Sequence, residues 1–518
     1  MMPEYLYASR RFMPAAIALL IGVLLLGACG APGAALAPTT LPDYWPTSAW
    51  RTSIPEEQGM DSAQLLRALQ HADEAQINLR SLTVIRNGYI VLDAYAQPFT
   101  ADRLYPVYSV TKSVTGLLVG IALHDGDLTS LRQPVLGFFP ERRIANRTPD
   151  KEAITIENLL TMQPGLDCAD SKVGYTVQDS QDWVQSILDL PMANPPGKTF
   201  VYCTRAPHLL SAILTKATGM STAAYAQARL FDPLGIRSAD RPWAADPHGI
   251  TIGGYGLALR THDMAKLGLL LLAGGQWDGK QVAPADWIAT TARGYAQVQP
   301  GQDYGYLFWV YPSDFAAEGL GDQRIMVMRD KNLVVVATAA HDGSKAPVMQ
   351  PLLMDYVVPA VKADGPLPPN PAAQAALQAK IATLANPVQP VPALPAIAAH
   401  ISGKRYSFPD NPPGWSSLSL TFAPGSATAQ AAISTTAGDA PVEIGLDNVY
   451  RLGRDANGGQ IALRGRWTGD HTFVVHELVI GDVNEYDARL DFSGNQVAAH
   501  VEETVFRQLK SDFIGTTR

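Results

Sequence analysis

The stretch YPVYSVTKSVTGLLVGIALHDGDL, residues 105–128, determines how the rest of the chain is interpreted. After Ser109 its apolar residues recur at helical spacing, which predicts a buried helix that begins near Ser109 and ends near Gly126. Ser109 and Lys112 are three residues apart and therefore lie on one face of that helix. This is the only S-x-x-K sequence in the chain. About one such match is expected by chance in a chain of this size, so the helical context gives the motif its weight.

The predicted helix gives a physical reason for placing a lysine beside a serine. The pKa of a free lysine is about 10.4, which makes it a poor base at neutral pH. Burial and the positive end of the helix dipole both disfavour the ammonium form, so they lower the pKa of Lys112. Lys112 can then activate the Ser109 hydroxyl, while the Ser109 backbone N–H is free to donate to an oxyanion. An N-cap serine with a snorkelling lysine is the alternative, but it leaves the burial of the lysine unexplained.

Two predicted hairpins indicate an α+β fold for the region around this helix. Asn87-Gly88 lies between the β-rich runs 82–86 and 89–95, and residues 325–328 and 333–338 flank a second turn. Helices are expected between the two hairpins. The terminal strands should therefore pair into one antiparallel sheet.

A change of pattern indicates a second domain. Amphipathic or apolar helices are expected at 61–75 and 348–361, and a Pro-rich segment follows the second of them. From Ile401 onward polar and apolar residues alternate in short runs separated by Gly, Asn and Asp. This alternation predicts a separate all-β domain, either a sandwich or a barrel.

Composition along the chain sets the expected boundaries. We expect a lipoprotein signal peptide at 1–28, a Pro- and Ala-rich tether at 29–46 and the α+β domain at 47–362. A linker with a short helix at 363–400 should then lead to the β domain at 401–518.

The N-terminal residues indicate export. Arg10 and Arg11 precede an apolar stretch of 15 residues, which is short for a membrane span of about 20. The stretch ends in Leu26-Gly27-Ala28-Cys29, which resembles a bacterial lipobox, in which cleavage precedes a cysteine that carries lipid. We expect a protein anchored through Cys29 at the extracytoplasmic face of the cell envelope, with no other membrane contact. A cleaved signal with an incidental Cys29 is the alternative.

Charge and missing motifs exclude several functional classes. The chain has 40 Lys and Arg residues against 48 Asp and Glu residues and no long basic run, so nucleic acid is not an expected partner. It has no G-x-S-x-G, which argues against an α/β-hydrolase nucleophile elbow. It has no H-E-x-x-H, and its 10 histidines lack paired ligand spacing, so neither a metal nor a cofactor is expected.

Residues 105–128 resemble the active-site helix of the serine β-lactamase and penicillin-binding superfamily, particularly its class C-like branch. Further segments resemble that branch in the same order, namely LLTMQPGLD at 159–167, FVYCT at 200–204, a helix and turn within 256–287, and GLGDQ at 319–323. The resemblance spans about residues 54–361. It implies a β-lactamase/transpeptidase-like domain and serine hydrolase chemistry.

The resemblance also implies roles for individual residues. Tyr202 would share proton transfer with Lys112, and a backbone N–H of Leu320 or Gly321 would join that of Ser109 in binding the oxyanion. The side chains or backbone groups expected to contact substrate are those of Thr204, Arg205, Gly319 and Gln323.

Two cysteines other than Cys29 are predicted to form a disulfide. Cys168 and Cys203 would lie outside the cytosol, where disulfides persist. Two separate buried thiols are the alternative. The family resemblance supports the disulfide, because a subgroup has cysteine at both positions.

The chain departs from the family pattern in two motifs. The second motif ends in Thr204, which cannot supply an amide, and the third lacks the Lys-Thr-Gly cation that holds a substrate carboxylate. An anionic β-lactam would then depend on Arg205 or Arg324, although each alone is more typical of a solvated surface side chain.

We therefore expect a serine hydrolase that cleaves an ester or amide bond of a small molecule or peptide through an acyl-enzyme on Ser109. A β-lactamase or a D-Ala-D-Ala-type peptidase is the alternative activity. A catalytically silent lipoprotein that binds a cell-wall component or another ligand is the non-enzymatic alternative. The sequence does not predict the oligomeric state.

Overall fold

The computed structural model of the protein describes residues 42–174, 180–237, 242–342 and 347–517. The predicted signal peptide, Cys29 and most of the predicted tether lie outside the described residues. None of the helices in the described ranges combines the length and the hydropathy that a membrane span requires.

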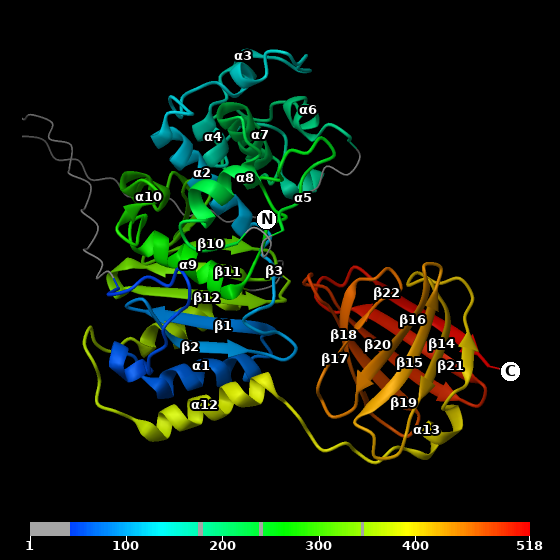
Figure 1. Ribbon diagram of the computed structural model, residues 1–518. Helices are drawn as coiled ribbons and strands as arrows, with labels where there is room; N and C mark the ends of the chain where they lie inside the picture. Colours follow the sequence, from blue (N-terminus) through cyan, green and yellow to red (C-terminus); the bar gives the residue numbers. More distant parts are fainter. Residues whose placement is uncertain (1–41, 175–179, 238–241, 343–346, 518) are drawn as a thin grey trace, which may run out of the picture. The chain divides into compact units, whose positions relative to one another are not determined.

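An eight-stranded antiparallel sheet forms the centre of the first domain (Figure 1). Both predicted hairpins belong to it, and a strand from each hairpin pairs with the other, with Val84 opposite Val335. The predicted α+β fold with paired terminal strands is confirmed. In sheet order the strands are β2 (Tyr89–Tyr95), β1 (Leu79–Arg86), β12 (Leu333–Ala339), β11 (Gln323–Met328), β10 (Phe315–Gly319), β9 (Trp309–Val310), β8 (Gln302–Tyr304) and β7 (Ala296–Gln299).

Helices cover both faces of this sheet. Along β12, Val335 packs into one apolar cluster, whereas Val334 and Val336 pack into another, because successive side chains of a strand point to opposite faces. The first cluster includes α1 (Ser62–Glu74), and the second includes α9 (Thr261–Leu272) and α2 (Val110–Asp125). The helix that follows Ser109 is therefore anchored in the larger core of the domain.

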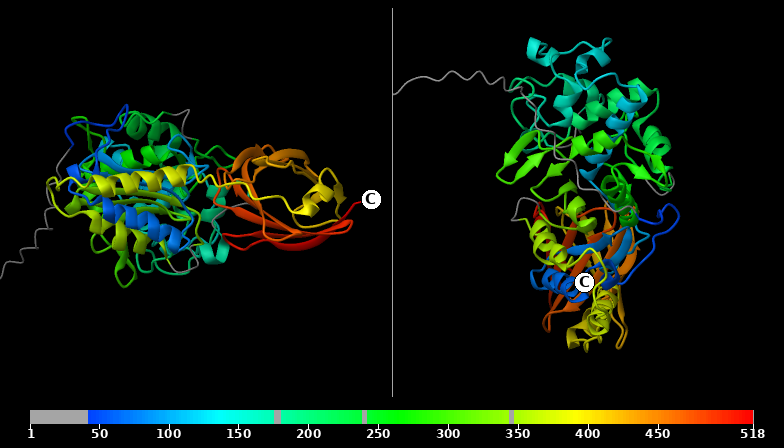
Figure 2. Two further views of the ribbon diagram at one scale, coloured as in Figure 1. Left: turned by 90° about the horizontal axis from the view of Figure 1, so that it is seen from below. Right: turned by 90° about the vertical axis from the view of Figure 1, so that its left-hand side faces the viewer.

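The Ala-rich helix expected within a linker packs on the first domain instead. This helix, α12 (Pro371–Ala385), contacts α1 and β2, and Figure 2 shows it beside α1 in the left view. Leu377 is buried in the cluster around α1, and Ile381 and Leu384 are partly buried against it. The alanines of this helix are mostly exposed, so Leu377, Ile381 and Leu384 form the contact.

The other α-helices of this domain that the structure describes lie between β2 and β7 in the sequence, with one exception after β12. They are α3 (Pro149–Glu152), α4 (Ile156–Leu160), α5 (Asp170–Val173), α6 (Trp183–Leu188), α7 (Ala206–Thr218), α8 (Thr222–Ala226), α10 (Ala285–Thr291) and α11 (Met349–Leu352). Two two-stranded antiparallel sheets complete it, β3 (Tyr105–Pro106) with β4 (Ala258–Leu259) and β5 (Gln276–Trp277) with β6 (Lys280–Gln281).

The C-terminal domain is a closed β-barrel, which decides between the two expected all-β architectures. A short helix, α13 (Ala396–Ile401), precedes it, and the sheet closes where Gly445 pairs with Arg464. Alternate side chains such as Val497, Ala499 and Val501 point into its core. Its strands are β13 (Arg405–Ser407), β14 (Trp415–Thr421), β15 (Thr428–Thr435), β16 (Gly438–Gly445), β17 (Arg451–Arg454), β18 (Gln460–Trp467), β19 (Thr472–Val479), β20 (Glu485–Ser493), β21 (Gln496–Glu503) and β22 (Lys510–Thr516).

Candidate active site

Ser109 stands at the start of α2, on a tight turn. Tyr108, just before it, has a φ of 46°, in the left-handed region that non-glycine residues seldom adopt. The Ser109 hydroxyl makes no capping hydrogen bond to the helix. The N-cap alternative therefore does not account for this serine, and its hydroxyl remains available for other contacts.

Lys112 lies against the Ser109 hydroxyl. Its Nζ is 2.7 Å from Ser109 Oγ and 2.9 Å from the carbonyl oxygen of Gly254. The residue is only 1% exposed, because α2 is packed into the apolar core. Burial lowers the pKa of Lys112 to about 7, and the negative charge of Asp170 opposes that shift. At neutral pH a large fraction of the molecules therefore holds an uncharged amine next to the serine.

Tyr202 faces the same pair of residues. Lys112 Nζ lies 5.0 Å from the centre of the Tyr202 ring, and the ring stacks on Trp309 with centroids 5.7 Å apart. Burial raises the pKa of Tyr202, and a hydrogen bond with Ser109 works in the opposite direction. The phenol therefore keeps its proton at neutral pH and can donate it.

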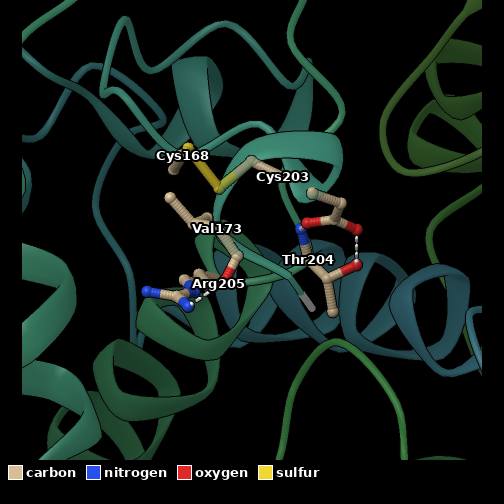
Figure 3. Close-up of a disulfide and its surroundings, with 6 residues drawn as sticks. Cys168, Val173, Cys203, Thr204 and Arg205 are labelled. Carbon is tan, nitrogen blue, oxygen red and sulfur yellow. Dashed lines mark hydrogen bonds between the residues drawn. A yellow bond between two sulfur atoms is a disulfide. The ribbon is translucent and has the colours of Figure 1, made fainter. Parts of the chain in front are cut away.

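A disulfide and a carboxylate fix the segment that carries Tyr202 (Figure 3). The predicted disulfide between Cys168 and Cys203 is present, with Cα atoms 5.5 Å apart. Asp170 accepts hydrogen bonds from the Thr204 N–H at 2.7 Å and from the Thr204 hydroxyl at 2.5 Å. The backbone N–H of Asp170 in turn donates to the Tyr202 carbonyl at 3.1 Å. Asp170 thus holds Thr204 and the Tyr202 backbone in place while its charge acts on Lys112.

The turn after β10 approaches the N–H of Ser109. A Cβ added to Gly319 would lie 2.3 Å from the Val107 carbonyl oxygen and 3.2 Å from the Ser109 nitrogen, so only glycine allows the strand to come this close. Leu320 and Gly321 follow in the turn and line a cleft of about 640 Å³ together with Ser109. The backbone of this turn and the Ser109 N–H border one space, as an oxyanion hole requires.

Two residues expected to contact substrate have other contacts. Gln323 is 2% exposed, and its Nε2 lies 2.7 Å from the Ala339 carbonyl oxygen and 3.1 Å from that of Gly321. It holds the turn in place and does not line the cleft. Arg205 donates to the Val173 carbonyl at 2.6 Å and is likewise not among the lining residues (Figure 3). Of the four residues expected to contact substrate, the structure places Thr204 and Gly319 in the lining of the cleft but not Gln323 and Arg205.

The arginine that lines the described cleft is paired with a carboxylate. Arg324 Nη2 lies 2.7 Å from Glu318 Oε1, and its side chain is 5% exposed. Tyr311 donates to the same Glu318 oxygen at 2.7 Å, and Arg324 also contacts Gln350. The positive charge of Arg324 is thus already matched before any substrate enters.

Several residues of this cleft stand in no motif that was recognised in the sequence, including Asp170, Trp309, Tyr311 and Glu318. Asp170 could have been suspected from its place two residues after Cys168, because the disulfide brings that segment to Tyr202. Nothing in the sequence pattern marked the other three. Among the described residues, no group of three or more His, Cys, Asp or Glu side chains is arranged to hold a metal ion.

Comparison with known protein families agrees with this geometry. Residues 63–356, more than half of the chain, match the family described as Beta-lactamase. The chain belongs to the Beta-lactamase family. This family consists of serine hydrolases.

Among curated relatives of this Beta-lactamase family member, 6-aminohexanoate-dimer hydrolase from Paenarthrobacter ureafaciens is 23% identical over 251 residues. That match covers 44% of the chain and 62% of the relative. Esterase EstB from Burkholderia gladioli is 28% identical over 155 residues, which cover 27% of the chain and 39% of the relative. The matches thus span less than two thirds of either relative.

A solved structure supports the fold. A protein described provisionally as 6-aminohexanoate-dimer hydrolase from Bacillus anthracis superposes with a TM-score of 0.50 and 17% identity. The superposition covers 62% of this chain and 89% of that protein.

Proposed function

We propose that the protein hydrolyses an ester or amide bond through an acyl-enzyme on Ser109. The observation that carries this proposal is the contact between Ser109 Oγ and the buried Lys112 amine at 2.7 Å. A lysine with a pKa of about 7 is matched to general-base catalysis near neutral pH. A surface lysine at its ordinary pKa would not be matched to this role, because it stays protonated near neutral pH.

In the acylation step, Ser109 Oγ attacks the substrate carbonyl carbon and its proton passes to Lys112 Nζ. The negative charge that develops on the carbonyl oxygen is bound by the Ser109 N–H and a backbone N–H of Leu320 or Gly321. Tyr202 then donates its proton to the leaving alkoxide or amine as the carbonyl–heteroatom bond breaks, and it recovers a proton from Lys112. In the second step water attacks the acyl carbon and its proton passes to the uncharged Lys112 amine. The bond to Ser109 Oγ then breaks as Tyr202 donates its proton to that oxygen and recovers a proton from Lys112, which releases the acid and free Ser109.

The charge arrangement favours esters and amides without a carboxylate next to the reacting carbonyl. Arg324 is paired with Glu318, so it has little charge left to attract a substrate anion. The names of the two curated relatives, an amide-dimer hydrolase and an esterase, support the same substrate classes. We rank these classes above β-lactams and D-Ala-D-Ala peptides, which carry such a carboxylate.

Hydrolysis of p-nitrophenyl esters of different acyl length tests the proposal. We expect Ser109→Ala to lose at least about 10³-fold in kcat while the protein stays folded. Ser113→Ala is the matched control, because Ser113 lies on the same helix but donates to the Leu307 carbonyl at 2.6 Å, away from the reaction. Equal rates in the wild type and Ser109→Ala would contradict the proposal and favour a binding protein.

Export and lipid anchoring through Cys29 are part of the same proposal and rest on the sequence Leu26-Gly27-Ala28-Cys29. Metabolic labelling with palmitate in a bacterial host should mark the wild type but not Cys29→Ser. Labelling of both proteins would show that Cys29 is not the lipid attachment site.

A further inference from the structure

The C-terminal barrel contains a cavity of about 250 Å³. This cavity has no role in the hydrolysis proposed at Ser109. One part of the barrel core is filled by contacting aromatic rings, those of Phe422, Trp467 and Phe473. Further along the same strands the inward positions hold small side chains, with Ala488 opposite Val475. Ala431 also lines the cavity. The space exists because these side chains are too short to fill a barrel of this size.

Two polar side chains enter this otherwise apolar space. Phe473 and Val475 on β19 are buried in the barrel core, so strand alternation points Glu477 into the same lumen. Tyr486 is the direct cross-strand partner of Glu477 on β20 and also lines the cavity. Within the part of the chain that the structure describes, neither the Glu477 carboxylate nor the Tyr486 hydroxyl has a hydrogen bond or an ion pair.

A partly buried carboxylate without a partner is costly, so its presence requires a reason. Burial raises the pKa of Glu477 to about 7, the charge of Asp455 adds to this rise, and His476 opposes it. The charged groups that act on Tyr486 are also acidic and include Glu503. Among the residues that the structure describes, no Lys or Arg lines the cavity. The polar end of the lumen is therefore suited to a cation.

We propose that the barrel lumen binds a small hydrocarbon molecule that carries one amine. The ammonium would donate hydrogen bonds to the Glu477 carboxylate and the Tyr486 phenol oxygen. The hydrocarbon part would pack against Leu418, Ile444 and Leu490, which line the rest of the space. A cavity of about 150 Å³ accepts benzene, so this one has room for roughly ten non-hydrogen atoms.

An anionic amphiphile of the same length would not satisfy this site. Its carboxylate would face Glu477 and Tyr486 with no cation beside them and would be repelled at neutral pH. A neutral alcohol would gain the apolar contacts but not the charge-assisted hydrogen bond. Comparing ligands with these three head groups therefore separates the apolar from the ionic contribution to the binding affinity.

Titration calorimetry of the full chain with octylamine, octanol and octanoate at pH 8 tests the proposal. We expect octylamine to bind at one site per chain, at least about tenfold tighter than octanol, and octanoate to bind most weakly. Glu477→Gln should weaken octylamine binding by about tenfold or more while leaving octanol unchanged. Glu443→Gln is the matched control, because Glu443 lies on the outer face of β16 and is exposed.

Ala488→Phe provides a second variant that fills the lumen and should abolish binding of both octylamine and octanol. Retained hydrolysis of a p-nitrophenyl ester and an unchanged near-ultraviolet circular dichroism spectrum would show that each variant is folded. The proposal is overturned if octylamine does not bind the folded wild type, or if octanoate binds as tightly as octylamine. It is also overturned if Glu477→Gln or Ala488→Phe leaves octylamine binding unchanged.

Discussion

Replacing Lys112 by methionine should lower the hydrolytic activity and raise the free energy of unfolding, and both effects should depend on pH. Methionine keeps much of the length of the side chain but cannot accept the Ser109 proton. Because general-base catalysis contributes about 10²- to 10⁴-fold, we expect Lys112→Met to lose at least 10²-fold in kcat/KM. In the wild type, kcat/KM should rise between pH 6 and pH 8 with a midpoint near 7, because only the uncharged amine of Lys112 is a base.

The stability change can be worked from the same pKa. The pKa of Lys112 falls from 10.5 in the unfolded chain to about 7 in the fold. Between these values the unfolded chain binds more protons, so the stability of the wild type rises with pH. Each tenfold change in a proton-binding constant is about 1.4 kcal/mol. Holding Lys112 in the fold therefore costs about 5 kcal/mol at pH 6 and about 2 kcal/mol at pH 9.

The substitution also removes the two hydrogen bonds to Ser109 and Gly254, each of which contributes about 1 kcal/mol. Lys112→Met should consequently be more stable than the wild type by about 3 kcal/mol at pH 6, and about equal to it at pH 9. Chemical unfolding followed by tryptophan fluorescence at both pH values measures this difference.

Lys151→Met is the matched control for these experiments. Lys151 is also 1% exposed, and it donates to the carbonyl oxygens of Ala145 and Leu188 rather than to a cleft residue. Its replacement should leave kcat/KM and its pH profile unchanged. A stability difference between Lys112→Met and the wild type that is equal at pH 6 and pH 9 would refute the reasoning. A wild-type rate profile that is flat between pH 6 and pH 8 would do the same.

Three further outcomes are expected. Tyr202→Phe should lower kcat by about 10²-fold or more with little change in KM, measured with p-nitrophenyl esters, because the phenol transfers a proton but leaves the ring packing intact; an unchanged kcat would exclude Tyr202 from proton transfer. Replacing both Cys168 and Cys203 by serine should lower the free energy of unfolding by about 4 kcal/mol, since the disulfide closes a loop of 35 residues; an unchanged denaturation midpoint would argue against the disulfide. Glu318→Gln should raise kcat/KM for nitrocefin, a carboxylate-bearing β-lactam, by about tenfold, because it releases the charge of Arg324; no gain would show that this ion pair does not control substrate charge.

The sequence predicted the framework of the fold because its signals are local. The Asn87-Gly88 turn and the alternation of the flanking runs define a hairpin wherever it occurs, and the structure places it as expected. The spacing of apolar residues after Ser109 similarly defines α2. The barrel closes through the pairing of Gly445 with Arg464, which is a contact between strands that are not adjacent in the sequence. The sequence therefore could not distinguish a barrel from a sandwich.

The site was predictable only where a motif marks it. Ser109, Lys112 and Tyr202 stand in ordered motifs, and the structure brings their side chains together. Asp170 and Glu318 act on residues that they contact only in the folded chain. The periodicity of the sequence does not predict such contacts. Gln323 stands in a motif yet is turned away from the cleft, because the Ala339 carbonyl offers its amide a buried partner. A residue type at a motif position thus does not by itself fix the direction of its side chain.

Intact-protein mass spectrometry after exposure to a fluorophosphonate tests the central claim, an activated serine at position 109, most directly. The wild type should gain the mass of one adduct, peptide mapping should place that adduct on Ser109, and both Ser109→Ala and Lys112→Met should remain unlabelled under the same conditions. A folded wild type that gains no adduct, or an adduct that maps to another residue, would contradict the claim.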